Sequence, residues 1–321
     1  MDASATSHLR RADDRAIAEA ARVLRGGGLV AFPTETVYGL GADATNGRAV
    51  ARIFEAKGRP QFNPLIVHVA SLAEAERHAV FNETARKLLV AFWPGALTLV
   101  LPRVHGCSLS ELVSAGLDTV ALRIPSHPVA LNLLGAADRP IAAPSANASG
   151  RITATTAQHV ADSLGDRVDL ILDGGATTLG LESTVIGFDG ERPLLLRAGA
   201  ITRQDIEAIG RPLSAPLNGK VQSPGQLASH YAPRAALRLD AMTVKPDEVL
   251  LAFGPLVPLG ARKTLNLSAT GDLKEAAANL FAMLHALDAS GAATIAVMPV
   301  PNSGLGEAIN DRLQRAASPR T

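Results

Sequence analysis

Hydrophobic positions follow two alternating patterns along the first 210 residues. Short apolar runs, typical of buried strands, alternate with stretches in which apolar residues recur every three or four positions, as on one face of a helix. Strands are predicted at 29–33, 64–69, 97–101, 119–125, 140–144, 168–173, 183–188 and 193–197. Helices are predicted at about 14–25, 47–57, 83–92, 127–134 and 155–164, with short ones beginning at Ser71 and Thr202. This interleaving predicts a three-layer α/β domain with a mixed sheet.

The pattern stops between residues 211 and 234, where four prolines and two glycines indicate a linker. It resumes with strands near 237–239, 249–253, 263–267 and 294–300 and helices near 272–289 and 305–317. Alternating strands and helices favour a second, smaller α/β unit with a parallel sheet. The polar residues 1–12 are predicted to be mobile. The expected division is therefore 1–12, 13–210, 211–234 and 235–321.

Composition narrows the class of protein. Of 321 residues, 47% are hydrophobic and 19% charged, so proper cores can form, and the net charge of +1 gives no global signature of nucleic-acid or membrane binding. One cysteine, Cys107, excludes an internal disulfide and a thiolate metal site. No apolar run approaches the ~20 residues of a membrane span, and residues 1–15 lack a signal-peptide core. We expect a cytoplasmic protein without a membrane partner.

The first polar cluster follows the strand predicted at 29–33. Thr34, Glu35 and Thr36 come directly after Pro33, and glycines follow at 39 and 41. Open α/β sheets bind ligands at the carboxyl ends of their strands, so this exit is a candidate cavity rim. An ordinary polar turn accounts for the same residues equally well.

A second cluster begins at the predicted end of the helix at 47–57. Lys57 and Arg59 flank a glycine, and Asn63 precedes the strand that contains His68. Arginine offers a planar fork and lysine a point charge for phosphate or carboxylate. Cations also suit a helix C-terminus for dipole reasons alone, and a lone histidine in a strand is more often a core residue than a ligand.

Two further clusters lie at strand ends. Residues 142–150 form a small, polar turn that can direct backbone N–H groups, Ser145 and Asn147 at an anion. Residues 181–185 place another polar group at a strand start. Arg123 lies inside an apolar strand and needs a buried partner, either a substrate carboxylate or a protein carboxylate such as Glu35 or Glu182.

Several site classes are absent from the sequence. Walker, dinucleotide, zinc and Gly-x-Ser-x-Gly motifs do not occur, and the eight histidines lack ligand spacing. We therefore predict no metal held directly by protein ligands. The residues alone indicate an α/β enzyme with cationic clusters at strand ends and an anionic, nucleotide-like ligand.

Taken together, the motifs resemble one family. The Sua5/YrdC/YciO family shows, in the same order, FPTETVYGLG, KGRPQFNPLIVH, WPGALTLVL, GLDTVALRIPSHP, PIAAPSAN, GLESTVI and LLRAG, which here cover residues 29–199. The later PGQLASHYAP and the small α/β tail are similar to the two-domain Sua5 branch. Gln226 departs from the methionine that is more frequent in this linker, which affects at most the local packing of a lid.

The resemblance implies a fold and an activity. The fold would be a YrdC-like twisted mixed sheet (13–210), a linker over the active site (211–234) and a smaller Rossmann-like parallel α/β domain (235–321). The activity would be that of an L-threonylcarbamoyladenylate synthase, an ATP-dependent nucleotidyltransferase. It joins L-threonine, bicarbonate and ATP into threonylcarbamoyl-AMP and pyrophosphate for the tRNA modification t6A. Mg²⁺ would accompany ATP, and downstream tRNA threonylcarbamoyl-transfer proteins would be partners.

The resemblance also assigns residues. Lys57 and Arg59 would be catalytic. ATP would be bound by Lys57, Arg59, Asn63, Thr119, Ser145, Asn147, Thr153, Arg197 and Tyr231. L-threonine would be bound by Thr36, His68, Arg123, Ala143 and Ser183, with its carboxylate on Arg123. Thr34 would lie at the cavity rim, and Glu35 would pair with a cavity cation.

The sequence is also compatible with two other functions. One is an RNA-binding or ribosome-associated module that uses the same cationic cavity without chemistry, so RNA contact stays an alternative. The other is a carbamoyl-transfer enzyme of the maturation type, which carries a related domain. The chain lacks the cysteine-rich and acyl-phosphate-like segments that such enzymes need.

Overall fold

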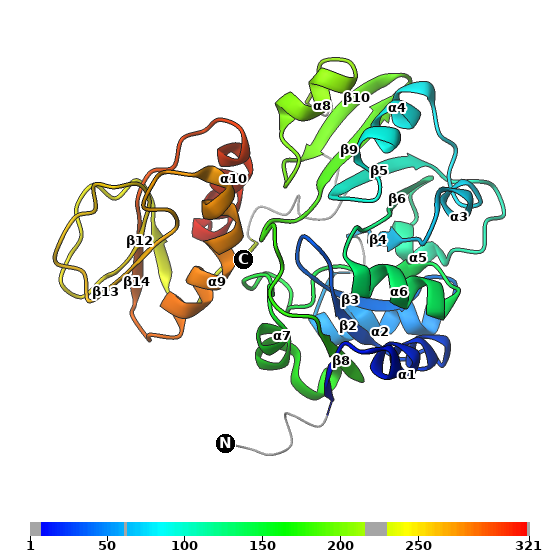
Figure 1. The fold of residues 1–321 in the computed structure, drawn as a ribbon, viewed down its shortest axis with the longest axis horizontal. Coiled ribbons are helices and arrows are strands. Elements are labelled where there is room, and N and C mark those ends of the chain that lie inside the picture. Colours follow the sequence, from blue (N-terminus) through cyan, green and yellow to red (C-terminus); the bar gives the residue numbers. More distant parts are fainter. Residues whose placement is uncertain (1–7, 61–62, 216–229, 320–321) are drawn as a thin grey trace.

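The computed structural model describes residues 8–60, 63–215 and 230–319, which form two sheets with their helices (Figure 1). The larger sheet has ten strands in the order β1-β8-β2-β3-β7-β4-β6-β5-β9-β10, and the smaller has four in the order β11-β14-β12-β13. The strands of the larger sheet are β1 Leu9–Arg11, β2 Val30–Pro33, β3 Tyr38–Asp43, β4 Ile66–His68, β5 Leu97–Pro102, β6 Thr119–Arg123, β7 Ile141–Ala142, β8 Leu170–Asp173, β9 Thr184–Asp189 and β10 Arg192–Arg197. Those of the smaller sheet are β11 Ala236–Arg238, β12 Val249–Ala252, β13 Lys263–Asn266 and β14 Thr294–Val297.

Helices cover both sheets. They are α1 Asp14–Arg25, α2 Gly47–Lys57, α3 Leu72–Glu76, α4 Glu83–Phe92, α5 Glu111–Ser114, α6 Pro128–Ala137, α7 Ala157–Leu164, the 3₁₀ turn η1 Gly165–Arg167, α8 Arg203–Ile209, α9 Leu273–Asp288 and α10 Leu305–Ala317. Side chains cap many N-termini, as at Thr202, which forms a capping box with Asp205. Across the described residues, none of these helices has the length and apolarity needed to cross a membrane.

The sheet types confirm the predicted fold class. The larger sheet is mixed, since β2 pairs antiparallel with β3 but parallel with β8, and β4 pairs parallel with β6 but antiparallel with β7. The smaller sheet is parallel in all three of its pairings. Most predicted elements are found close to their expected positions.

A strand that the sequence pattern does not predict follows the first polar cluster. Tyr38–Asp43 forms β3, which turns back antiparallel on β2, so the polar residues 34–37 lie at the tip of a hairpin. Glycines at 39 and 41 interrupt the apolar pattern, so the sequence pattern does not indicate this strand. Gly41 is needed for packing, because a Cβ there would lie 2.8 Å from the Phe32 ring and 2.9 Å from Ile141.

The prediction of a mobile segment through residue 12 is wrong for Leu9–Arg11. These residues form β1, which pairs parallel with β8, with Leu9 opposite Ile171. A three-residue edge strand with two arginines carries no apolar alternation, and its partner strand lies far along the chain. Residues 1–7 lie outside the described part, as do residues 216–229 of the predicted linker.

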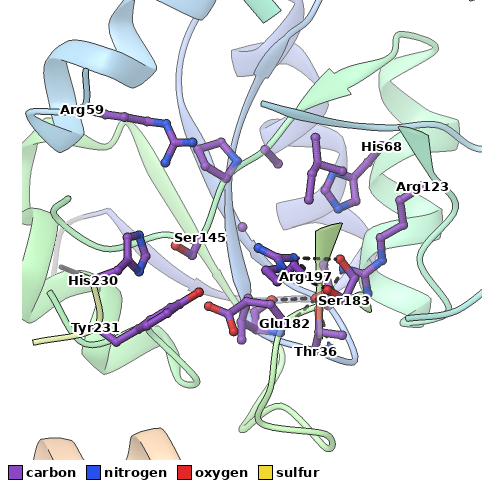
Figure 2. Close-up of a pocket in the computed structure, with 16 residues that line it drawn as sticks. Thr36, Arg59, His68, Arg123, Ser145, Glu182, Ser183, Arg197, His230 and Tyr231 are labelled. Atoms are coloured by element: carbon purple, nitrogen blue, oxygen red, sulfur yellow. Dashed lines mark hydrogen bonds between the residues drawn. The ribbon is translucent and has the colours of Figure 1, made fainter. Parts of the chain in front are cut away.

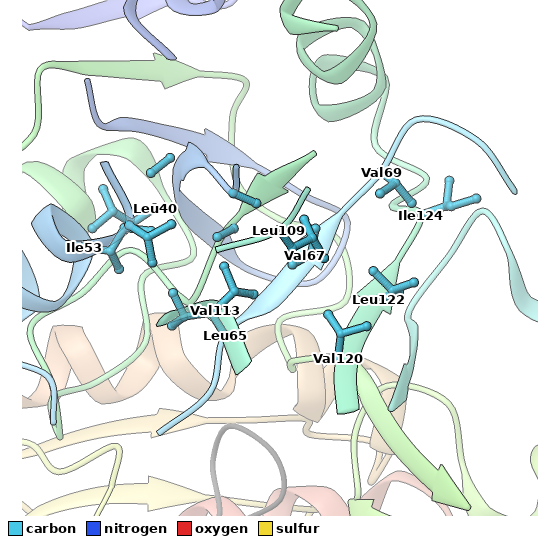
Figure 3. Close-up of a cluster of buried hydrophobic side chains, with 14 of the residues drawn as sticks. Leu40, Ile53, Leu65, Val67, Val69, Leu109, Val113, Val120, Leu122 and Ile124 are labelled. Atoms are coloured by element: carbon cyan, nitrogen blue, oxygen red, sulfur yellow. The ribbon is translucent and has the colours of Figure 1, made fainter. Parts of the chain in front are cut away.

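The hydrophobic core explains how the pocket walls are held. Figure 3 shows part of the main core, where Leu40 of β3, Ile53 of α2, Val67 of β4 and Leu122 of β6 converge. These side chains are buried, so strands that carry polar residues at their ends are fixed by apolar contacts along their length.

A second core joins the two units. It contains buried residues of α9 and α10 together with Val37, Ile152 and Leu181 from the larger unit. The loop at Gly180 lies directly on α9, since a Cβ at this glycine would lie 2.5 Å from the Ala277 carbonyl oxygen. In Figure 1, α9 and α10 lie on the side of the small sheet that faces the larger unit. The units therefore share apolar surface.

Two histidines stack where the units meet. The rings of His159 in α7 and His285 in α9 lie 3.9 Å apart and nearly parallel. His285 Nε2 also lies 3.1 Å from the Thr153 carbonyl oxygen. Burial and the charge of His285 lower the pKa of His159 to about 4, although Asp162 acts in the opposite direction. Burial also lowers the pKa of His285.

We predict that this stack makes stability fall as the pH drops from about 6.5 towards 4. Below pH 6.5 His159 becomes protonated in the unfolded chain but stays neutral in the folded one. Proton uptake therefore favours the unfolded state, and the free energy of unfolding falls. In His159→Phe, which keeps a stacking ring, melting temperature should fall less over this interval. With allowance for solvent screening, the fall in the free energy of unfolding should be smaller than in wild type by about 1 kcal/mol. This corresponds to a difference of about 2–4 °C in the fall of the melting temperature.

The same substitution at the exposed His105 serves as the control. Calorimetric melts at pH 7, 5.5 and 4.5 provide the measurement. Parallel pH profiles for wild type and His159→Phe would contradict this account of the stack.

Candidate active site

The predicted polar clusters meet in one pocket. Its walls come from the ends of β2, β4, β6 and β10, the turn after β7 and the segment before β9. Figure 2 shows Arg59 and His230 on one side, His68 and Arg123 on the other, and the Tyr231 hydroxyl pointing between them. The lining residues are Thr34, Thr36, Val37, Gly39, Arg59, Ile66, His68, Arg123, Ala143, Pro144, Ser145, Glu182, Ser183, Arg197, His230 and Tyr231.

The cationic wall begins at the end of α2. Gly58 ends the helix in the left-handed conformation, with Lys57 and Arg59 on either side. Lys57 Nζ donates to the carbonyl oxygens of Ser145, at 2.6 Å, and of Asn147. Arg59 Nη2 donates to the Pro64 carbonyl oxygen at 3.0 Å. Within the described residues, neither cation forms an ion pair with a carboxylate.

Burial and neighbouring cations disfavour the charged forms of these two side chains. Burial, together with the charges of Arg59 and Arg167, lowers the pKa of Lys57 well below its usual value. Burial and the charge of Arg197 lower the pKa of Arg59 to about 10. A bound anion would offset these penalties, because an opposite charge nearby stabilises the protonated form of both side chains. The described residues place no carboxylate on Lys57 or Arg59, so an anionic ligand would suit this wall.

Unpartnered polar atoms accompany the cations. Both amide atoms of Asn63, Oδ1 of Asn147, Nδ1 of His230 and Oη of Tyr231 are buried and have no hydrogen-bond partner among the described residues. Each such group costs about 1–3 kcal/mol if it stays unsatisfied. Burial also raises the pKa of Tyr231 to about 12, so its hydroxyl remains a donor at neutral pH. These atoms suit a polar ligand.

The opposite wall centres on Arg123. Its Nη2 lies 2.6 Å from Glu35 Oε1, its Nη1 donates to Thr36 Oγ1 at 2.9 Å, and its Nε donates to the Gly95 carbonyl oxygen at 3.0 Å. Of the partners left open by the sequence, Glu35 is the one found, as expected for a cavity cation. Burial tends to raise the pKa of Glu35, but the charge and hydrogen bond of Arg123 outweigh it and lower the pKa.

His68 and Ser183 complete this wall. Burial and the charge of Arg123 lower the pKa of His68 to about 3, so the imidazole is neutral at pH 7. Ser183 Oγ lies 2.7 Å from Thr98 Oγ1 and accepts from Arg197 Nη2 at 3.1 Å. The wall is thus polar but offers mostly neutral groups to the cavity.

Nine of the residues assigned by resemblance line the pocket, and five do not. Lys57 Nζ donates to the carbonyl oxygen of Asn147, and Arg59 Nε donates to the carbonyl oxygen of Asn63 at 3.4 Å. Thr153 Oγ1 donates to Glu182 Oε1 at 3.1 Å. Thr119 begins β6, at the opposite end of that strand from Arg123. The roles given to all fourteen residues remain predictions.

Sequence reasoning gave no site role to two polar lining residues, Glu182 and His230. Glu182 belongs to the GLESTVI motif but was considered only as a partner for Arg123. Its Oε2 instead lies 2.9 Å from Nε of Arg312 in α10. His230 packs edge-on against Tyr231, with ring centroids 4.0 Å apart. The HYAP motif was the available signal for His230, whereas nothing in the sequence pairs Glu182 with Arg312.

Comparison with known proteins identifies both parts of the chain. Residues 22–199 match the Sua5/YciO/YrdC family model, described as telomere recombination. Residues 201–318 match the model of the threonylcarbamoyl-AMP synthase C-terminal domain.

Curated relatives match over nearly the whole chain. Threonylcarbamoyl-AMP synthase of Bacillus subtilis is 42% identical over 96% of this chain and 94% of its own. The synthase of Pyrococcus abyssi is also 42% identical, over 97% of this chain and 96% of its own. A putative synthase of Mycobacterium leprae is 41% identical over 59% of this chain and 84% of its own.

Solved structures agree with these relationships. The crystal structure of P. abyssi Sua5 complexed with L-threonine has a TM-score of 0.87 and 38% identity, covering 97% of this chain and 96% of that one. Escherichia coli YciO has a TM-score of 0.54 and 25% identity, covering 60% of this chain and 94% of that one. The family resemblance seen in the sequence is confirmed: the chain belongs to the Sua5/YciO/YrdC family and carries the C-terminal domain of threonylcarbamoyl-AMP synthases.

Proposed function

We propose that the pocket is the active site of an L-threonylcarbamoyladenylate synthase that acts in formation of the tRNA modification t6A. The reaction joins L-threonine, bicarbonate and ATP into threonylcarbamoyl-AMP and pyrophosphate, which makes the protein a nucleotidyltransferase. The observation that carries this proposal is the junction, in one cavity, of a wall that bears the buried cation Arg59 with a polar wall centred on Arg123. The names of the full-length relatives support it.

ATP is assigned to the cationic wall. Lys57, Arg59, Ser145 and Asn147 would hold the triphosphate. Asn63, Thr119, Thr153, Arg197 and Tyr231 would contact the nucleotide. The unpartnered polar atoms of Asn63, Asn147 and Tyr231 support this placement, since a nucleotide offers both donors and acceptors.

Threonine is assigned to the opposite wall, formed by Thr36, His68, Arg123, Ala143 and Ser183. Arg123 uses three of its five N–H groups in the bonds described above. Two remain for the threonine carboxylate, beside Glu35. A neutral His68 does not repel the amino group, which a protonated imidazole would do.

The chemistry needs no covalent protein intermediate. The neutral threonine amine adds to CO₂ with loss of a proton, or to bicarbonate with loss of water, to give a carbamate. A carbamate oxygen then attacks the α-phosphate in line and displaces pyrophosphate. Catalysis then rests on positioning and on cations that neutralise the developing phosphate charge. Arg59 and Lys57 supply that charge, and no side chain is assigned as general base.

Mg²⁺ is proposed only as the companion of ATP. Within the described ranges, no group of three or more His, Cys, Asp or Glu side chains could hold a metal. Glu182, which lines the pocket, pairs with Arg312, and Glu35, which lies next to the lining residues Thr34 and Thr36, pairs with Arg123. The donor set therefore does not fit a protein-held metal, whereas phosphate oxygens suit this cation well.

The wider setting follows from the reaction. The product would be taken up by tRNA threonylcarbamoyl-transfer proteins, and a cytoplasmic location suits that transfer. A module that only binds RNA is less well supported, because Lys57 and Arg59 are 3% and 7% exposed. Side chains so deep are poorly placed for a nucleic-acid backbone, which is contacted at the surface.

The purified protein is expected to release pyrophosphate from ATP when Mg²⁺, L-threonine and bicarbonate are all present. Omission of threonine or bicarbonate should reduce the rate to background, because the carbamate nucleophile cannot form. A coupled pyrophosphate assay measures this. Equal release without threonine would contradict the proposal.

Arg59→Ala should lower the rate by roughly 100-fold or more, the usual loss when one preorganised donor is removed from a developing charge. Arg86→Ala is the matched control, because Arg86 pairs with Glu76 on the exposed surface. Steady-state pyrophosphate release, with circular dichroism as a check of folding, distinguishes the two. A well-folded Arg59→Ala with wild-type activity would remove this residue from the mechanism.

A further inference from the structure

The small unit places one arginine directly behind the pocket. Arg312 of α10 is completely buried, which is unusual for an arginine. Its Nη2 donates to the carbonyl oxygen of Ala198 at 2.8 Å, and its Nη1 lies 2.6 Å from Asp311. The side chain thus crosses from the small unit into the wall of the larger one.

The principal partner of Arg312 is a pocket residue. Arg312 Nε lies 2.9 Å from Glu182 Oε2, and the other carboxylate oxygen accepts from Thr153 Oγ1. Burial tends to raise the pKa of Glu182, but the charges of Arg312 and Arg197 outweigh it and lower the pKa to about 2. Glu182 is therefore ionised. Without Arg312, the Glu182 carboxylate would lose the guanidinium that pairs with it. Its negative charge would then repel an anionic ligand in the pocket.

Arg312 also contacts Tyr231. Its guanidinium carbon lies 5.2 Å from the centre of the Tyr231 ring, within the range of a cation–π interaction. Phe281 of α9 stacks on the same ring at 5.6 Å. Tyr231 has a φ of 66°, a conformation that L residues rarely adopt, so surrounding contacts must hold it. The ring is fixed largely by the small unit, while its hydroxyl enters the pocket.

We propose that Arg312 is a positioning residue for the reaction. It holds the Glu182 carboxylate and the Tyr231 ring in the pocket wall, and it offsets the Glu182 charge that would otherwise oppose the triphosphate. This proposal rests on the proposed function, and it gives the small unit a direct part in building the ATP site.

A second Arg–Glu pair supplies the matched control. Arg238 and Glu248 both belong to the small unit, with Nη2 and Oε2 2.5 Å apart, and neither lines the pocket. Arg312→Met and Arg238→Met make the same chemical change at the two sites. A role confined to stability predicts activity that follows the folded fraction of each variant, whereas positioning predicts a loss of activity in fully folded Arg312→Met.

Calorimetric titration with ATP and the pyrophosphate assay test the proposal on the full chain. Arg312→Met should weaken ATP binding and lower kcat/KM for ATP by tenfold or more, while Arg238→Met stays within twofold of wild type. Arg312→Lys keeps the charge but loses the planar fork, so its values should lie between those of wild type and Arg312→Met.

Tyr231→Phe in each background tests whether Arg312 acts through the tyrosine. The loss caused by Tyr231→Phe should be as large with Arg238→Met as in wild type, but clearly smaller with Arg312→Met. A folded Arg312→Met that binds ATP and turns over within twofold of wild type would overturn the proposal, as would additive losses. Unfolding of both Arg312 variants would assign the residue to the fold alone. Wild-type protein that does not bind ATP would overturn the proposed function itself.

Discussion

Burial of Lys57 and Arg59 without a carboxylate partner is the constraint on which the pocket depends. Removing charge from water costs several kcal/mol unless other groups compensate. Here the compensation comes from backbone carbonyl oxygens at Ser145, Asn147 and Pro64. Those bonds tie the end of α2 to the turn after β7 and so fix the shape of the cationic wall. The remaining electrostatic cost is one that an anionic ligand can remove.

The mixed sheet makes this arrangement possible. The strands β4, β6 and β7 are neighbours, and their apolar side chains hold them rigidly on the main core. The polar residues at their ends therefore have fixed positions without a ligand. The Arg123–Glu35 pair and the neutral His68 give the second wall a different electrostatic character from the first, so the two walls suit ligand groups of different charge.

Much of this fold was predictable because its buried strands are apolar and its helices amphipathic. The failures have physical causes. Neither β1, with Arg10 and Arg11, nor the glycine-containing β3 shows an alternation of apolar and polar residues. Only the pairing of these strands with β8 and β2 in the structure reveals them. The pocket clusters were recognisable as polar strand ends, and the family motifs supplied their roles. Arg312 reads as an ordinary solvent-facing cation, because its partner Glu182 lies 130 residues away in the sequence.

The core shared by the two sheets has a thermodynamic consequence. Val37, Ile152 and Leu181 are buried in one cluster with residues of α9, α10 and the small sheet. Separation of the units would expose these side chains to water, at about 25 cal/mol for each Å² of apolar surface. Loss of this contact therefore lowers the stability of both units, so that local opening of one favours local opening of the other.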